Sequence, residues 1–203
     1  MTNPVPFLVG FAGLAVLWLV TGKATGFNIL KIFEGQDKRP SSSKFQFFLW
    51  TAAVVFGYLV VYATPDKSGN YHFTPLDTGL SGNLLIAMGI SGATAVTAKA
   101  ITSSNEAKKI KVKPDLVKVK DKDGNETDEV VGGVFQADDG TPDLGKIQMI
   151  VWTLIAVGVF LAGVIHGVVT NDPSRQLPDI GQPLMILMGL GHTAYVGKKI
   201  AGD

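Results

Sequence analysis

The residues of this sequence whose types and spacing best suit a functional site belong to one polar pattern that occurs twice. The pattern K-x-Q-x-x-x-W-T occupies residues 44–51 and recurs 102 residues later at 146–153. The glutamine and tryptophan of each copy are four residues apart, so they share one face of a helix. Such a pair can bind a ligand, or it can anchor a helix through a hydrogen-bonded glutamine and a tryptophan in the interfacial aromatic belt. We expect anchoring and packing for all four residues: Gln46, Trp50, Gln148 and Trp152.

Histidine is the other residue type here that could carry chemistry. The chain has three, His72, His166 and His192, which are too scattered for a metal site, and it has no cysteine. His192 lies in an apolar segment, either as a pH-sensitive or ligand-contacting group or, as we expect, as a neutral histidine hydrogen-bonded between helices. No nucleophile–base pair, phosphate loop or carboxylate pair stands in a credible place. The sequence therefore predicts no catalytic residue, no cofactor and no metal, and a protein that is not an enzyme.

Five long stretches of the chain contain no Asp, Glu, Lys or Arg. They are residues 1–22, 45–65, 78–98, 147–171 and 180–197. Each is long enough for a helix that crosses about 30 Å of hydrocarbon. The first lacks a positive n-region and a cleavage site, so we expect a retained span rather than a signal peptide. The fold class predicted is an all-α polytopic membrane protein with about five transmembrane helices.

The charges are divided unequally between the two sides of such an arrangement. Sixteen of the eighteen Lys and Arg residues fall on one side, and Lys67 and Arg175 fall on the other. The positive-inside rule then places the N-terminus outside and the C-terminus in the cytoplasm. The lysines expected at the cytoplasmic membrane surface are Lys44, Lys99, Lys146, Lys198 and Lys199.

The repeated pattern opens two related segments, 45–100 and 146–203. After an indel in the outer loop the shift becomes 100, where L-L-I-A-M-G-I-S (84–91) aligns with L-M-I-L-M-G-L-G (184–191). Each segment is predicted to be a helical hairpin that leaves the cytoplasm and returns. The two have the same orientation, whereas many carriers are built from inverted repeats, so a carrier is disfavoured.

Small residues in the predicted spans allow close approach of helices in lipid. Gly89 and Gly189 occupy matching places in the returning helices, and Gly163 and Gly167 form a G-x-x-x-G. We expect helix packing, within the monomer or between subunits of a homo-oligomer, with a narrow polar path as the alternative. No Asp or Glu lies inside a span, which argues against a proton pump or a cation antiporter.

Residues 101–145 form a polar, cytoplasmic insertion between the two hairpins. Lysine alternates with apolar residues on the approach to an Asp-Gly turn at 123–124, which predicts a small β-hairpin. An isolated hairpin is marginal in water, so residues 105–145 are expected to contact a neighbouring subunit or a cytoplasmic protein partner. The strand-like part has no aromatic residue and mixes both charges, which argues against nucleic acid.

The segment between the first two spans, residues 23–44, is predicted to lie along the cytoplasmic membrane interface. Its end carries three serines that can cap the following helix: Ser41, Ser42 and Ser43.

The second hairpin also carries a resemblance to known proteins. The run G-G-V-F-Q-A-D-D-G-x-x-x-L-x-K-I-Q-M-x-x-W-T at 132–153, with L-M-G-L-G-H-T-A-Y-V-G-K-K at 187–199, resembles a broad group of bacterial inner-membrane proteins with a doubled hairpin of this kind. This chain departs from the group's pattern in having lysine where arginine is usual. The resemblance implies the hairpin architecture and a bacterial inner membrane, and it implies no reaction.

Two functions therefore remain open. One is an oligomeric membrane module that forms a small pore, gated or assembled through its cytoplasmic insertion. The other is a membrane anchor or scaffold that recruits a cytoplasmic partner to the lipid bilayer. The small residues of the returning helices favour the first, and the lack of charge inside the spans favours the second.

Overall fold

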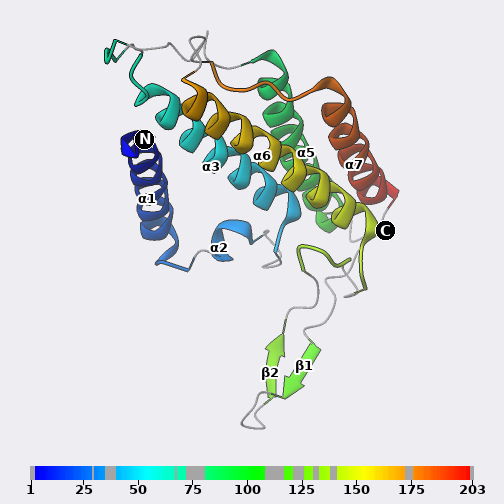
Figure 1. The fold of residues 1–203 in the computed structure, drawn as a ribbon. Helices are drawn as coiled ribbons and strands as arrows, with labels where there is room; N and C mark the ends of the chain where they lie inside the picture. The colour runs from blue at the N-terminus through cyan, green and yellow to red at the C-terminus, as the bar shows by residue number, and fades with distance from the viewer. Residues whose placement is uncertain are drawn as a thin grey trace.

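The computed structural model describes residues 3–28, 30–34, 40–66, 68–71, 81–107, 117–120, 126–129, 133–137, 141–171 and 176–201. The elements assigned within them are helices α1 (Val5–Thr25), α2 (Leu30–Phe33), α3 (Ser42–Tyr62), α5 (Gly82–Ala107), α6 (Leu144–Thr170) and α7 (Gln182–Ala201), and strands β1 (Val117–Lys120) and β2 (Glu126–Glu129). The chain is therefore mainly helical, with one small two-stranded sheet among the described residues (Figure 1).

Three helices have the length and composition of membrane spans. Among the described residues, α1, α3 and α6 are long and apolar enough to cross a bilayer. Helix α5 contains a shorter apolar part, Gly82–Ala93, and α7 does not meet the same requirement. These helices indicate a membrane-embedded protein. The predicted first span at 1–22 corresponds to α1.

Four helices form a closed square in the order α3, α6, α7, α5, since each packs on the next and α5 packs back on α3. Helices α3 and α6 run in one direction and α5 and α7 in the other (Figure 1). We call the end at which α3 and α6 begin the base end. The C-terminus lies at this end, and α1 begins at the opposite one (Figure 1).

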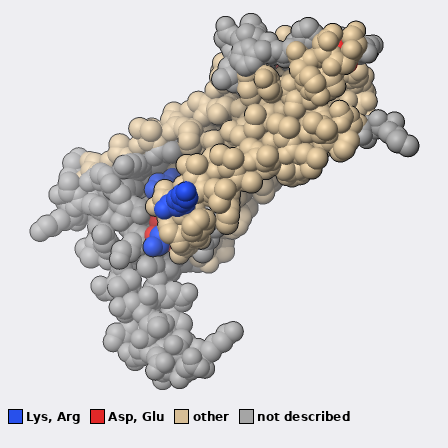
Figure 2. All heavy atoms as spheres, turned by 90° about the vertical axis from the view of Figure 1, so that its left-hand side faces the viewer, with Lys and Arg blue, Asp and Glu red and all other residues tan. Residues whose placement is uncertain are grey.

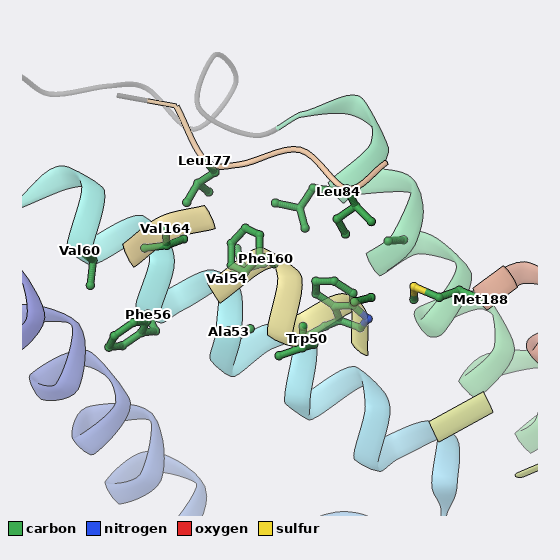
Figure 3. Close-up of a cluster of buried hydrophobic side chains, with 14 residues drawn as sticks. Trp50, Ala53, Val54, Phe56, Val60, Leu84, Phe160, Val164, Leu177 and Met188 are labelled. Atoms are coloured by element: carbon green, nitrogen blue, oxygen red, sulfur yellow. The ribbon is translucent and has the colours of Figure 1, made fainter. Parts of the chain in front are cut away.

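The interior of the square is filled by large apolar side chains (Figure 3). Its fully buried members include Trp50 on α3, Leu84 and Ala87 on α5, Phe160 on α6 and Met188 on α7. The rings of Trp50 and Phe160 meet edge to face, with centroids 6.3 Å apart. Dispersion contacts of this kind hold helices together where lipid removes the hydrophobic drive between them.

Helix α1 lies outside the square, against α3. A β-carbon at Gly10 would come within 2.6 Å of Val60, and one at Gly13 would meet Leu59. Phe11 stacks obliquely on Phe56 with centroids 5.2 Å apart. Two glycines, one turn apart, thus let the backbone of α1 approach α3 closely.

The strands β1 and β2 pair antiparallel and lie beyond the base end of the bundle (Figure 1). Their register places Lys118 opposite Asp128 and Lys120 opposite Glu126. The predicted Asp-Gly turn at 123–124 lies outside the described residues.

Two element boundaries differ from those expected. Helix α5 continues to Ala107, seven residues into the predicted insertion at 101–145. No proline or glycine interrupts the run I-T-S-S-N-E-A at 101–107, so nothing local ends the helix there. Helix α3 begins at Ser42 rather than at residue 45, because Ser41 is its N-cap and its side chain accepts from the backbone N–H of Lys44. The prediction that one of the three serines caps this helix is confirmed.

Charge is unevenly distributed over the described surface. On the face drawn in Figure 2, the Lys side chains gather at one end, and the long flank of the bundle beside them carries neither cations nor carboxylates. An uncharged flank with a cationic end is the surface that lipid and headgroups would meet.

Candidate functional site

Gln46 is a fully buried polar group in the contact between the two repeated segments. Its side chain is fully buried, and its Nε2 donates to the backbone carbonyl of Met149 at 2.9 Å and to the Thr153 hydroxyl. The Thr153 hydroxyl in turn donates to the same carbonyl at 2.9 Å. A glutamine on α3 thus holds one turn of α6, which fits the expected role in packing.

Trp50 does not lie where the sequence predicted. Its side chain is 0 % exposed, whereas the interfacial aromatic belt would leave it in contact with headgroups. Residue 50 follows Gln46 by four positions, so both side chains face α6 and the ring enters the centre of the square (Figure 3). The belt prediction is therefore wrong for Trp50.

The second copy of the pattern has different surroundings. Gln148 is exposed, and Trp152 is half-buried and packs against the edge of the core. Both lie on α6, one position before the buried Met149 and Thr153. The structure brings Gln46 and Trp50 together with α6, whereas of their counterparts Gln148 is exposed and Trp152 is only half-buried.

A layer of polar groups lies in the base half of the square. Among the described residues, the buried side-chain atoms without a hydrogen-bond partner are Gln46 Oε1, Trp50 Nε1, Ser91 Oγ, and Nδ1 and Nε2 of His192.

Neighbouring contacts place these groups at one level. A β-carbon at Gly92 would lie 3.5 Å from the ring of Phe47, and one at Gly191 would lie 3.2 Å from Met149 Cα. Ser91 directly precedes Gly92 on α5, and His192 directly follows Gly191 on α7. His192 is 3 % exposed, so the expected burial between helices is met, but the expected hydrogen bond has no partner in the described part of the chain.

The loops that lead into α3 and α6 make the same contacts, 102 residues apart. We call residues 33–44 and 135–146 the base loops. Phe33 O accepts from Ser41 N and Phe135 O from Asp143 N, and the bridges Glu34–Pro40 and Gln136–Pro142 close each loop.

Each base loop also ends in a helix cap and a lysine clamp, by which we mean a lysine whose Nζ donates back to a backbone carbonyl near the start of the loop. Asp143 caps α6 by accepting from the backbone N–H of Gly145 at 2.9 Å, as Ser41 caps α3. Lys44 Nζ donates to the Glu34 carbonyl, and Lys146 Nζ donates to the Gln136 carbonyl. The two predicted surface lysines are thus also structural, because each ties a base loop to its helix. Sequence reasoning did not assign them this second role.

The first base loop is joined to Val134, the residue just before the second base loop. The hydroxyl of Ser42, buried at the start of α3, donates to the carbonyl of Val134 at 2.6 Å. At the opposite end, Asp179 accepts from Ser81 Oγ at 2.6 Å and from Asn83 Nδ2 at 2.9 Å. Hydrogen bonds therefore connect the parts of the chain before and after the insertion's strands at both ends of the square.

The remaining lysines of the prediction are placed only by their helices. Lys99 lies on α5, and Lys198 and Lys199 lie near the end of α7, in the parts of these helices nearer the base end. Their side chains lie outside the described residues.

The glycines predicted to pack helices divide into two groups. A β-carbon at Gly163 would come within 2.6 Å of Pro178, so the absence of a side chain at Gly163 lets the loop that contains Pro178 pack against α6. Gly89, Gly167 and Gly189 face open space, so they do not mediate close packing within the described part of the chain. Sequence reasoning missed Gly57, where a β-carbon would come within 2.9 Å of the Phe160 ring. Gly191, one of the small residues of the second returning helix, does pack closely, since a β-carbon there would lie 3.2 Å from Met149 Cα.

The residues that the structure describes contain no group of three or more His, Cys, Asp or Glu close enough to hold a metal ion. What the site can do chemically is hold two helical segments together through a polar contact inside an apolar bundle. Comparison with known proteins found no matching family model, no matching curated protein and no matching solved structure.

Proposed function

We propose that this chain is a non-enzymatic, oligomeric membrane scaffold. Five of its helices cross a bacterial inner membrane and hold the β1–β2 hairpin in the cytoplasm for a soluble protein partner. The observation that carries the proposal is the contrast between a filled helical bundle and a small hairpin that stands beyond its base end (Figure 1).

The packing of the helices supports the proposal of five crossings. Helices α5 and α7 pack alongside α3 and α6 and run opposite to them, so a bilayer that holds one pair also surrounds the other. The base end carries Lys44 and Lys146, and the positive-inside rule makes it cytoplasmic. The N-terminal end of α1 is then outside and the C-terminus inside. The matching base loops support two parallel copies of one hairpin.

A scaffold needs a surface that a partner can reach. A two-stranded hairpin is marginally stable alone, so a partner that binds it supplies the third strand or the packing surface that it lacks. The register of β1 and β2 pairs lysine positions with acidic ones, so the sequence of the hairpin is a ribbon of mixed charge. Such a ribbon suits recognition by complementary charge.

A gated polar path is the second candidate, and the buried polar layer favours it. Gln46, Ser91 and His192 bring hydrogen-bonding atoms without described partners into the centre of the bundle. In one copy of the chain, however, the fully buried rings of Trp50 and Phe160 fill the interior of the bundle. A path would therefore require Trp50 to move, or several copies of the chain around a shared axis.

The scaffold proposal is tested by photo-crosslinking in native membranes. A photoreactive amino acid at Val119 on β1 is expected to capture one discrete cytoplasmic protein, and the same group at Ser68, at the opposite end of the molecule, is expected to capture none. The matched control exchanges Lys118 and Asp128, which keeps opposite charges across the register and so preserves the hairpin. Loss of the crosslink in that variant would assign recognition to the charges.

Ion flux into liposomes separates the two candidates. For a scaffold, the purified chain and its Trp50→Ala variant both leave the liposomes as tight as protein-free ones. For a gated path, removing the indole opens the bundle and raises the flux of the variant above that of the parent. Flux from either protein, together with no discrete crosslink from Val119, would contradict the scaffold proposal.

A further inference from the structure

The contact between the two repeated segments is one-sided. Gln46 on α3 reaches Met149 and Thr153 on α6, but Gln148, which holds the matching place on α6, is exposed. A two-fold axis between the segments would use both glutamines reciprocally. One used glutamine and one exposed glutamine are instead the mark of a head-to-tail, heterologous contact.

The acceptor half of this contact also exists twice. On α6 it consists of the Met149 carbonyl and the Thr153 hydroxyl that donates to it at 2.9 Å. On α3 the hydroxyl of Thr51 donates to the carbonyl of Phe47 at 2.8 Å, in the same geometry 102 residues earlier. Thr51 is half-buried and Phe47 is 46 % exposed. Each segment thus has a glutamine face and a threonine face.

One face of each kind is used inside the chain, and one of each kind is left over. The glutamine face left over is on α6, with Gln148, Trp152 and Ile155, of which Ile155 is 44 % exposed. The threonine face left over is on α3, with Phe47 and Thr51. These two remaining faces have the pairing that already joins the segments within one chain.

We propose that a second copy of this chain binds here, with the threonine face of its α3 against the glutamine face of α6. The contact repeats the internal one: Gln148 of one chain donates to the Phe47 carbonyl and the Thr51 hydroxyl of the next. An amide at a membrane-embedded helix surface gains more from such a partner than from lipid. The inference deepens the proposed function and rests on it, because it names the interface of the oligomeric module.

The extent of the contact is limited by its surroundings. Helix α1 covers the neighbouring flank of α3 farther from the base end, where Gly13 meets Leu59. On α6, Val159 stands where α3 has Gly57, the residue that admits Phe160. The interface between copies is therefore concentrated in the base half, around Gln148 and Thr51, and the helices of the two copies diverge beyond it.

Disulfide formation between two differently tagged copies tests this interface, because the parent chain has no cysteine. One copy carries Gln148→Cys and the other carries Thr51→Cys, co-expressed in native membranes and oxidised. The expected product is a mixed disulfide that carries both tags and migrates as two chains. The matched control replaces Gln148→Cys by Leu154→Cys, a residue 48 % exposed on a different side of α6, and is expected to give only the collision background.

The outcomes are separable. A product from Gln148→Cys alone, with none between the two tags, would overturn the head-to-tail arrangement in favour of a two-fold one. No product above the Leu154→Cys background would mean that Gln148 faces headgroups only, and the interface would be refuted. Repeating the experiment with residues 117–129 replaced by a Gly-Ser linker separates the two proposals, since the disulfide persists even if no partner binds the hairpin.

Discussion

Gln46 and Gln148 occupy identical sequence contexts and have opposite surroundings. One is buried and hydrogen-bonded to α6, and the other is on the outer surface of the chain. Helical periodicity places each glutamine on the same face as its tryptophan, and it was sufficient to predict a packing role. It does not say which face of a helix meets which neighbour. For that reason the sequence could not distinguish the two copies, nor predict that Trp50 lies in the core.

Replacing the two glutamines by leucine should have unequal effects on stability. Gln46→Leu removes a buried donor to the Met149 carbonyl, and we expect a loss of about 1 kcal/mol in the free energy of unfolding. That loss corresponds to a fall of about 2–4 °C in the midpoint of thermal unfolding for a protein of this size. Circular dichroism in a detergent that keeps the chain monomeric measures it.

Gln148→Leu is the matched control, because its side chain has no described partner within the chain and is exposed. Its midpoint should stay that of the parent. Equal shifts in the two variants would show that the contact seen at Gln46 does not stabilise the folded chain.

At the scale of elements, the two base loops repeat more than the sequence pattern suggested. Pro40 and Pro142, with a capping residue after each, already matched in the sequence. Phe33 and Phe135 continue the same shift, and their carbonyls accept the hydrogen bonds that close the loops. That signal was available in the sequence and was not used. The lysine clamps on Glu34 and Gln136 could not have been read from it, because they join a side chain to a backbone carbonyl ten residues away.

The packing of α7 on α6 depends on Gly191 rather than on Gly189, the glycine that matches Gly89 in the alignment of the two repeats. Gly191→Val should lower the free energy of unfolding by about 1–3 kcal/mol. The new β-carbon would lie 3.2 Å from Met149 Cα, and relieving that contact requires the backbone of α6 or α7 to shift. Gly189→Val lies two residues away on the same helix, faces open space, and should change stability little. Thermal unfolding in the monomeric state compares the two variants, and an equal or larger loss for Gly189→Val would refute the observed packing.

At the scale of the whole molecule, the apolar stretches predicted where the long helices lie, because runs without charge are a strong and local signal. The order of the helices around the square depends on contacts between residues about 100 positions apart, and no local pattern encodes it. The continuation of α5 to Ala107 was missed for a different reason: the charged residues that end an apolar run do not end a helix.

The most direct test of the account is the side of the membrane on which each end of the bundle lies. Single cysteines at exposed residues, introduced into a chain that has none, can be labelled with an impermeant maleimide in right-side-out and inverted vesicles. Ser68→Cys and Gln176→Cys report the end opposite the base, and Ser104→Cys and Thr141→Cys report the base end.

Two parallel hairpins predict that Ser68→Cys and Gln176→Cys are labelled only in right-side-out vesicles, and that Ser104→Cys and Thr141→Cys are labelled only in inverted ones. Labelling of Ser68→Cys and Gln176→Cys from opposite sides would contradict the account, since the two hairpins would then enter the membrane from different sides.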